Sequence, residues 1–276
     1  MAVDWRSSVG TPSLSLDDNE LARDYDRISS TRQFEAGKRL IEELKPRLGE
    51  RVLDVGCGTG QLAEYIADIV GPAGYVLGID PLPLRIELAE AKARANLAFK
   101  VGDAYDLDGL PDSGFDAVVL NSVFHWLPQK TGPLLAFARL LRPGGRIAIS
   151  TALKGHRTRL QEIVQSVLTE PQFVRFPRPR ESLTFRVDAE EMRALFETTG
   201  FGATMIEVRE TEQRFPSPEA AIRFSEASSF GNFLGHLPDE LKFRARAIIR
   251  QRLQAITTAD GIVQRHRRLV AVAVRK

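Results

Sequence analysis

Residues 51–60 read Arg51-Val-Leu-Asp-Val-Gly-Cys-Gly-Thr-Gly60, and this stretch decides the fold of the chain. Its apolar residues are typical of a strand that is buried on both faces, and the helical pattern of residues 61–70 follows at once. The three glycines allow a tight turn and leave no Cβ in front of the backbone. The stretch therefore predicts the first strand of a parallel α/β sheet, with a ligand crevice at the strand's carboxyl end.

The spacing of the glycines separates two classes of cofactor. The dinucleotide fingerprint has glycine at its first, third and sixth positions, but the sixth position counted from Gly56 is Gln61. The pattern from Asp54 to Gly60 instead resembles motif I of the class I S-adenosylmethionine (SAM) methyltransferases. In that family the turn cradles the amino-acid end of SAM. The alternative is a structural turn that binds no ligand.

Acidic residues follow the next two predicted strands. The strand of residues 75–79 ends at Asp80, where a carboxylate can accept hydrogen bonds from both ribose hydroxyls of a nucleoside. The strand of residues 97–101 is followed by Asp103, and the resemblance implies that Asp103 accepts the adenine amino group. A plain turn at residues 102–104 is the alternative to that role.

The resemblance also implies the whole architecture. It predicts a Rossmann-like α/β fold with a seven-stranded sheet of order 3-2-1-4-5-7-6, an antiparallel last strand and helices on both faces. The remaining strands are expected at residues 115–120, 146–150, 204–208 and 266–274, with residues 141–145 as the turn into the fifth strand. Residues 158–170 and 188–199 are predicted to be helices.

Three segments complete the predicted organisation. Residues 1–45 form a tail and helices that cap the cofactor, and Tyr25 either contacts SAM or packs within such a helix. Residues 46–276 form the methyltransferase domain. Residues 217–262, which are largely helical, are inserted between the last two strands as a substrate lid.

The resemblance assigns cofactor contacts by position. The residues that occupy those positions are Tyr25, Asp54, Gly56, Gly58, Gly60, Gln61, Asp80, Pro81, Asp103, Ala104, Asn121 and Ser122. The substrate is expected to contact His125, Trp126, Phe230, Phe233 and His236, of which the last three lie in the predicted lid.

The segment Asn121-Ser-Val-Phe-His-Trp-Leu-Pro128 follows the fourth predicted strand, facing the expected position of the methyl group. It is similar to the corresponding stretch of trans-aconitate and juvenile hormone acid methyltransferases, which esterify carboxylates. Quinone and sterol C-methyltransferases keep similar motifs. His125 is the candidate catalytic residue: it acts as a base, orients the acceptor, or packs with Trp126. A carboxylate acceptor would need no base, whereas a hydroxyl would.

Composition limits the function further. The 276 residues carry a net charge of +2, too small to argue for nucleic acid, and Cys57 is the only cysteine. The basic residues between 242 and 268 form either a solvated helix face or a phosphate-binding stripe. No metal site, membrane span or secretory signal is expected, which makes the predicted location cytoplasmic.

The predicted function is in-line methyl transfer from SAM to a small-molecule acceptor, with S-adenosylhomocysteine as product and O-methylation of a carboxylate or hydroxyl as the expected chemistry. The alternatives are a methyltransferase acting on RNA or protein, and a SAM-binding protein without turnover. We expect a monomer or homodimer.

Overall fold

A computed structural model describes residues 30–177, 184–228 and 233–276 of the chain. Tyr25, Phe230 and the helical pattern predicted before residue 30 lie outside the described residues. The described chain divides into two compact units. The sheet unit comprises residues 30–154, 184–209 and 268–276, and the helical unit comprises residues 155–177, 210–228 and 233–267.

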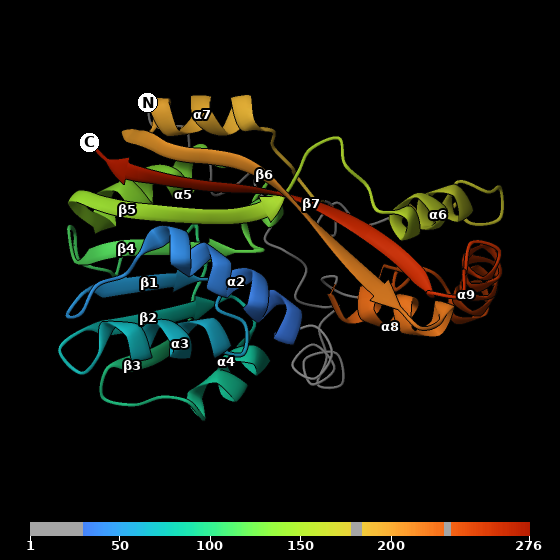
Figure 1. Cartoon of the computed structure of the whole chain (residues 1–276), viewed down its shortest axis with the longest axis horizontal. Helices are drawn as coiled ribbons and strands as arrows, with labels where there is room; N and C mark the ends of the chain where they lie inside the picture. The colour runs from blue at the N-terminus through green and yellow to red at the C-terminus, as the bar shows by residue number, and fades with distance from the viewer. Residues whose placement is uncertain (1–29, 178–183, 229–232) are drawn as a thin grey trace. The chain divides into compact units, whose positions relative to one another are not determined.

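A seven-stranded sheet with the order β3-β2-β1-β4-β5-β7-β6 confirms the predicted topology (Figure 1). Neighbours from β3 to β5 pair in parallel, and β7 runs antiparallel to β5. The strands are β1 (Arg51–Val55), β2 (Tyr75–Asp80), β3 (Leu97–Val101), β4 (Phe115–Asn121), β5 (Leu141–Ala152), β6 (Phe201–Phe215) and β7 (Ile262–Arg275). The carboxyl ends of the parallel strands, where ligands bind in such sheets, therefore meet at one edge.

Helices cover both faces of the sheet, because alternate residues of each strand point to opposite sides. On one face α2 (Ser30–Leu44) and α3 (Gln61–Val70) pack against Val52, Val119 and Ala148. On the other face α5 (Thr131–Leu140) and α7 (Ala189–Thr198) pack against Leu53, Val118 and Ile147. The short helix α4 (Pro83–Glu90) begins with proline, which suits the first helical turn because it has no N–H to leave unpaired.

Three strands differ in length from the prediction. The predicted turn at residues 141–145 belongs to β5, whose pairing with β4 is irregular between Phe115 and Ala117. Strands β6 and β7 are each several residues longer than expected and continue from one unit into the other. The segment that extends β6 beyond residue 208 is mostly charged and polar, and its Glu210 forms an ion pair with Arg267 of β7, so the apolar pattern used for prediction is missing there.

The helical unit contains α6 (Arg159–Leu168), α8 (Pro218–Ser228) and α9 (Asp239–Gln254). Ile163, Ile222 and Ile249, one from each helix, share its apolar core. The basic residues of α9 form ion pairs within the unit, among them Arg246 with Glu226 and Arg252 with Glu170. These pairs favour the solvated helix face over a phosphate-binding stripe. None of the helices in the described ranges has the length and apolarity needed to cross a membrane.

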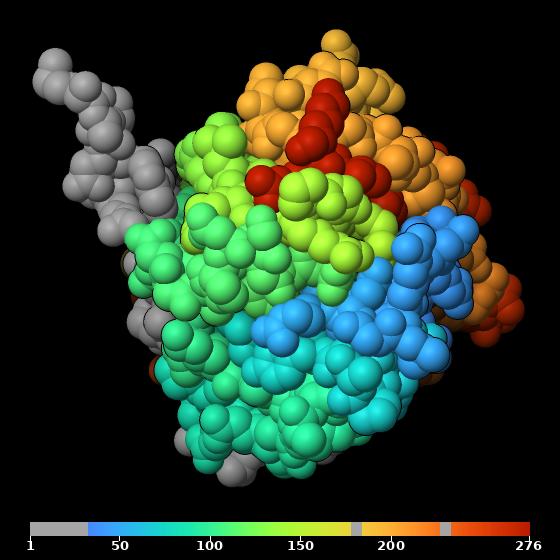
Figure 2. Space-filling view, turned by 90° about the vertical axis from the view of Figure 1, so that its left-hand side faces the viewer, coloured from blue at the N-terminus to red at the C-terminus, as the bar shows by residue number. Residues whose placement is uncertain are grey.

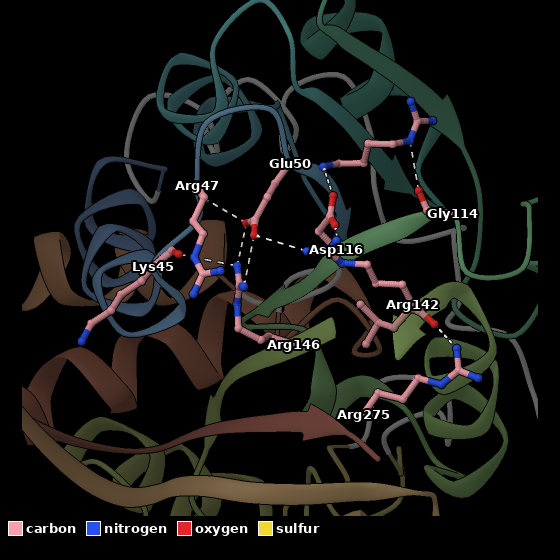
Figure 3. Close-up of polar contacts among 10 residues, drawn as sticks. Lys45, Arg47, Glu50, Gly114, Asp116, Arg142, Arg146 and Arg275 are labelled. Atoms are coloured by element: carbon pink, nitrogen blue, oxygen red, sulfur yellow. Dashed lines mark hydrogen bonds and ion pairs between the residues drawn. The ribbon is translucent and has the colours of Figure 1, made fainter. Parts of the chain in front are cut away.

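A buried ion pair lies where the sheet unit's parallel strands begin. Glu50 accepts hydrogen bonds from Arg146 at 2.6 Å and 3.1 Å and from the Arg47 N–H at 2.9 Å (Figure 3). Burial works to raise the pKa of Glu50, but the hydrogen bonds and charges of Arg146 and Arg47 outweigh it and hold that pKa below its usual value. Figure 2 shows the face where the loop after α2 (blue) meets the start of β5 (yellow-green). Through its hydrogen bonds to Arg47 and Arg146, Glu50 connects the loop that follows α2 to strand β5.

Candidate functional site

The glycine turn after β1 is held closely against β2 and the segment after β4. Gly56 has a φ of 72°, and a Cβ added there would lie 2.2 Å from Cγ2 of Val123. The N–H groups of Gly56 and Cys57 both donate to the carbonyl of Ile79, at 2.7 Å and 2.9 Å. Gly56 is therefore required both by its left-handed backbone and by the approach of Val123.

Two buried carboxylates, Asp54 and Asp80, lie beside this turn. Asp80 accepts the N–H of Gly58 at 2.9 Å through Oδ2 and the N–H of Leu82 at 3.0 Å through Oδ1. Asp54 is 1% exposed, and its buried Oδ2 has no hydrogen-bond partner among the described residues. Burial, and secondarily the charge of Asp80, raise the pKa of Asp54 to about 7. Burial and both carboxylates also raise the pKa of the Cys57 thiol.

Asp54 should make the stability of the ligand-free protein depend on pH. Because its folded pKa of about 7 lies above the ordinary Asp value of 3.8, its contribution is full below about pH 4 and is lost as pH rises to 7. The expected loss is on the order of 4 kcal/mol, since one pKa unit corresponds to about 1.36 kcal/mol. Urea unfolding between pH 5 and pH 8 should show a shallower decline for Asp54→Asn. Parallel profiles for the two proteins would contradict this assignment.

The predicted adenine-binding turn lies at the end of β3. Asp103 is half-buried and accepts the N–H of Tyr105 at 2.9 Å through Oδ1. Burial raises its pKa, partly offset by that hydrogen bond. Ala104 next to it is buried in the core. Gln61 is the first residue of α3, and Pro81 directly follows the last residue of β2, while the contact of both with SAM stays a prediction.

The end of β4 is anchored to two other elements. Asn121 donates through Nδ2 to the carbonyl of Gln33 in α2 at 2.9 Å, while its buried Oδ1 finds no hydrogen-bond partner in the part of the chain that the structure describes. Ser122 adopts a φ of 66°, uncommon for a residue other than glycine, and its N–H donates to the carbonyl of Ser150 in β5 at 2.8 Å. The chain therefore turns sharply here, into the segment that carries His125.

His125 lies on a short 3-10 helix, η4 (Phe124–Trp126). Its Nδ1 lies 3.1 Å from Oγ1 of Thr151 and 3.5 Å from the N–H of Ala152. A backbone N–H can only donate, so Nδ1 is the accepting nitrogen and the neutral ring carries its hydrogen on Nε2. Burial and the positive charges of Arg268, Arg186 and Lys130 hold the pKa of His125 well below its usual value. The imidazole is therefore neutral and offers a donor.

Arg268 is a site residue that the sequence analysis did not identify. From β7 it donates through Nη2 to Oγ of Ser122 at 2.9 Å, and through Nε to Oγ of Ser150 at 2.9 Å. It also donates to the Ser150 carbonyl at 3.0 Å. Arg186 contributes a second positive charge near His125. A positive potential therefore surrounds the segment that follows β4.

A family comparison identifies the domain that these residues build. Residues 53–149 match the model of a methyltransferase domain family. The chain carries a class I SAM-dependent methyltransferase domain. The glycine turn, Asp80, Asp103 and His125 all lie within the matched residues of this methyltransferase domain.

Individual relatives agree with the family. The chain is 38% identical over 131 residues to aklanonic acid methyltransferase DauC of Streptomyces sp. (strain C5), covering 46% of this chain and 59% of that protein. It is 35% identical over 137 residues to nocamycin O-methyltransferase of Saccharothrix syringae, covering 48% of each protein. The match thus spans about half the length of these curated relatives.

A solved structure of a methyltransferase in complex with the Haloferax volcanii Trm112 activator has a similar fold. The TM-score is 0.60 at 19% identity, with 93% of this chain and 96% of that chain covered. SAM is the cofactor of the methyltransferase domain family. The buried Oδ2 of Asp54, which has no hydrogen-bond partner within residues 30–177, 184–228 and 233–276, is consistent with a polar ligand beside the glycine turn.

The predicted substrate residues that the structure describes fall into two groups. His125 and Trp126 lie together on η4, with ring centroids 5.1 Å apart. Phe233 is 5% exposed in the core of the helical unit, which favours a packing role, and His236 belongs to the same unit. The substrate role of both stays a prediction. No group of three or more His, Cys, Asp or Glu that could hold a metal occurs among the described residues.

Proposed function

We propose that the protein transfers the methyl group of SAM to a carboxylate oxygen of a small-molecule acid. SAM supplies a methyl group that its sulfonium already activates, so the chain's task is to hold the acceptor in place and exclude water. In this proposal the glycine turn holds the amino-acid end of SAM. Asp80 then holds the ribose, and Asp103 holds the adenine amino group.

The observation that carries the proposal is the neutral, buried imidazole of His125 in a positive environment. Because Nδ1 accepts hydrogen bonds, the other ring nitrogen, Nε2, carries the hydrogen and is a donor. A donor at Nε2 suits an anionic oxygen of the acceptor, whereas this nitrogen cannot take up a proton from the acceptor. Arg268 and Arg186 add the charge that attracts an acid. A carboxylate acceptor is already deprotonated at neutral pH and needs no base. His125 therefore orients the acceptor in this proposal.

The names of the two relatives agree with an oxygen acceptor on a small molecule. One is named for aklanonic acid and the other is named as an O-methyltransferase. The ion pairs along α9 and the small net charge give no support to the alternative acceptor, RNA.

Deuterated-methyl SAM tests the proposal directly. The protein is incubated with a size-fractionated cell extract, and label is followed by mass spectrometry before and after mild alkaline hydrolysis. We expect label in small molecules that alkali releases as deuterated methanol, because esters hydrolyse whereas ethers and C-methyl groups do not. Alkali-stable label would overturn the carboxylate assignment, and label only in protein or RNA would favour the macromolecular alternative.

The variant Arg268→Met tests whether the positive charge near His125 binds the acid. We expect the variant to raise the KM for the acid at least tenfold while SAM affinity changes little, because its charge acts on the acceptor. Arg193→Met, an exposed arginine of α7 in the same unit, is the matched control and should behave as the wild type.

A further inference from the structure

Three carbonyl groups of the segment that carries His125 accept hydrogen bonds from outside it. The Phe185 N–H donates to the His125 carbonyl at 2.7 Å. The ammonium group of Lys130 donates to the carbonyls of Phe124 at 3.2 Å and of Leu127 at 2.6 Å. A single side chain therefore holds the residue before His125 and the second residue after it.

Lys130 differs from an ordinary surface lysine. It is 8% exposed, and its Nζ lies 4.9 Å from the centroid of the Phe124 ring. Burial lowers its pKa to about 8, against the opposing charge of Glu191. Burying an ammonium is costly, and such groups occur where their donors are satisfied. The two carbonyls and the aromatic ring supply that compensation, so the conformation of η4 and the burial of Lys130 depend on each other.

We propose that Lys130 is a positioning residue that acts through His125, by fixing the 3-10 turn on which the imidazole is carried. The inference rests on the proposed function, in which His125 orients the methyl acceptor. Lys130 itself contacts backbone carbonyls, and those contacts fix where Nε2–H is presented. Without its ammonium, the carbonyls of Phe124 and Leu127 lose their donor and the turn relaxes toward other conformations.

Lys130→Met tests the proposal, because methionine keeps most of the side chain's volume and removes the donors. We expect kcat to fall at least tenfold with SAM affinity within about twofold of the wild type. In a His125→Asn background the same change should alter kcat by less than about twofold, since residues that act as one unit are not additive. Equal losses in both backgrounds would show that Lys130 does not act through His125 and would overturn the proposal.

A second readout does not depend on turnover. The ring nitrogens of His125 can be observed by nitrogen-15 NMR, with the signals assigned through His125→Asn. The wild type should show the Nε2–H tautomer at neutral pH. In Lys130→Met we expect shifted signals and a mixed tautomer population, whereas exposed Lys100→Met should leave them unchanged. Wild-type signals in folded Lys130→Met would contradict the inference.

Lys130→Arg guards against a variant that fails to fold. Arginine keeps a charged donor, so we expect the His125 signals to stay near their wild-type positions and kcat to recover most of its value. Displaced signals in this variant, together with unchanged signals in Lys130→Met, would overturn the proposal. If the wild-type protein transferred no methyl group at all, the proposed function would fail while the NMR comparison still decided the role of Lys130.

Discussion

Replacing Asp80 with alanine is expected to weaken SAM binding by about 100-fold, or ~2.8 kcal/mol at 1.4 kcal/mol per factor of ten. The proposed hydrogen bonds to the ribose account for part of this loss. The rest comes from the protein itself, because the N–H groups of Gly58 and Leu82 lose their common acceptor and the glycine turn loses one of its links to the end of β2.

Isothermal titration with S-adenosylhomocysteine measures this effect without needing the acceptor. Asp80→Asn keeps one acceptor oxygen and should give an intermediate loss of affinity. Asp68→Ala, at an exposed carboxylate on α3, is the control and should bind as the wild type does. Circular dichroism must show that all three variants are folded. Unchanged affinity in folded Asp80→Ala would remove Asp80 from the cofactor site.

Glu50→Gln should lower the stability of the sheet unit by about 3 kcal/mol, because it leaves the half-buried guanidinium of Arg146 without its anionic partner. The lowered pKa of Glu50 gives the pH dependence: its stabilising contribution is present above about pH 4.5 and is lost as pH falls through the folded pKa. The wild type and the variant should therefore approach equal stability in acid.

Urea unfolding followed by a probe in the sheet unit checks this prediction. Glu35→Gln removes the carboxylate of an exposed ion pair with Lys38 in the same unit, and it should cost no more than about 1 kcal/mol. If the two variants were equally stable, the network of Figure 3 would be a surface feature without energetic weight.

Short sequence patterns were sufficient to predict the first strand and the helix that follows it. Residues 51–60 were sufficient for β1 and the start of α3, because an apolar run, three glycines and a helical repeat adjoin one another. The sequence explained only in part why position 56 is glycine. We expected a residue without Cβ so that a ligand could approach the backbone, and the structure shows that the side chain of Val123 also requires this space. That contact joins the ends of two strands far apart in the chain, so no short pattern contains it.

The residues that set the environment of His125 could not be predicted in the same way. Arg268 lies 146 residues from Ser122, and only the antiparallel pairing of β7 with β5 brings them together. Lys130 is near His125 in sequence, but a lysine in a polar loop predicts solvent exposure. Its ammonium group is hydrogen-bonded to the carbonyls of Phe124 and Leu127, and Glu191 of α7 supplies an opposite charge.

The buried thiol of Cys57 has a consequence for the protein's redox chemistry. Thiolates are the form of cysteine that alkylating agents and oxidants attack, and burial beside Asp54 and Asp80 keeps this sulfur protonated. Because the sequence has no second cysteine, an oxidant has no resolving thiol in the same chain. The glycine turn thus carries a sulfur atom that serves as an apolar side chain and is protected from the oxidative damage that an exposed thiol would invite.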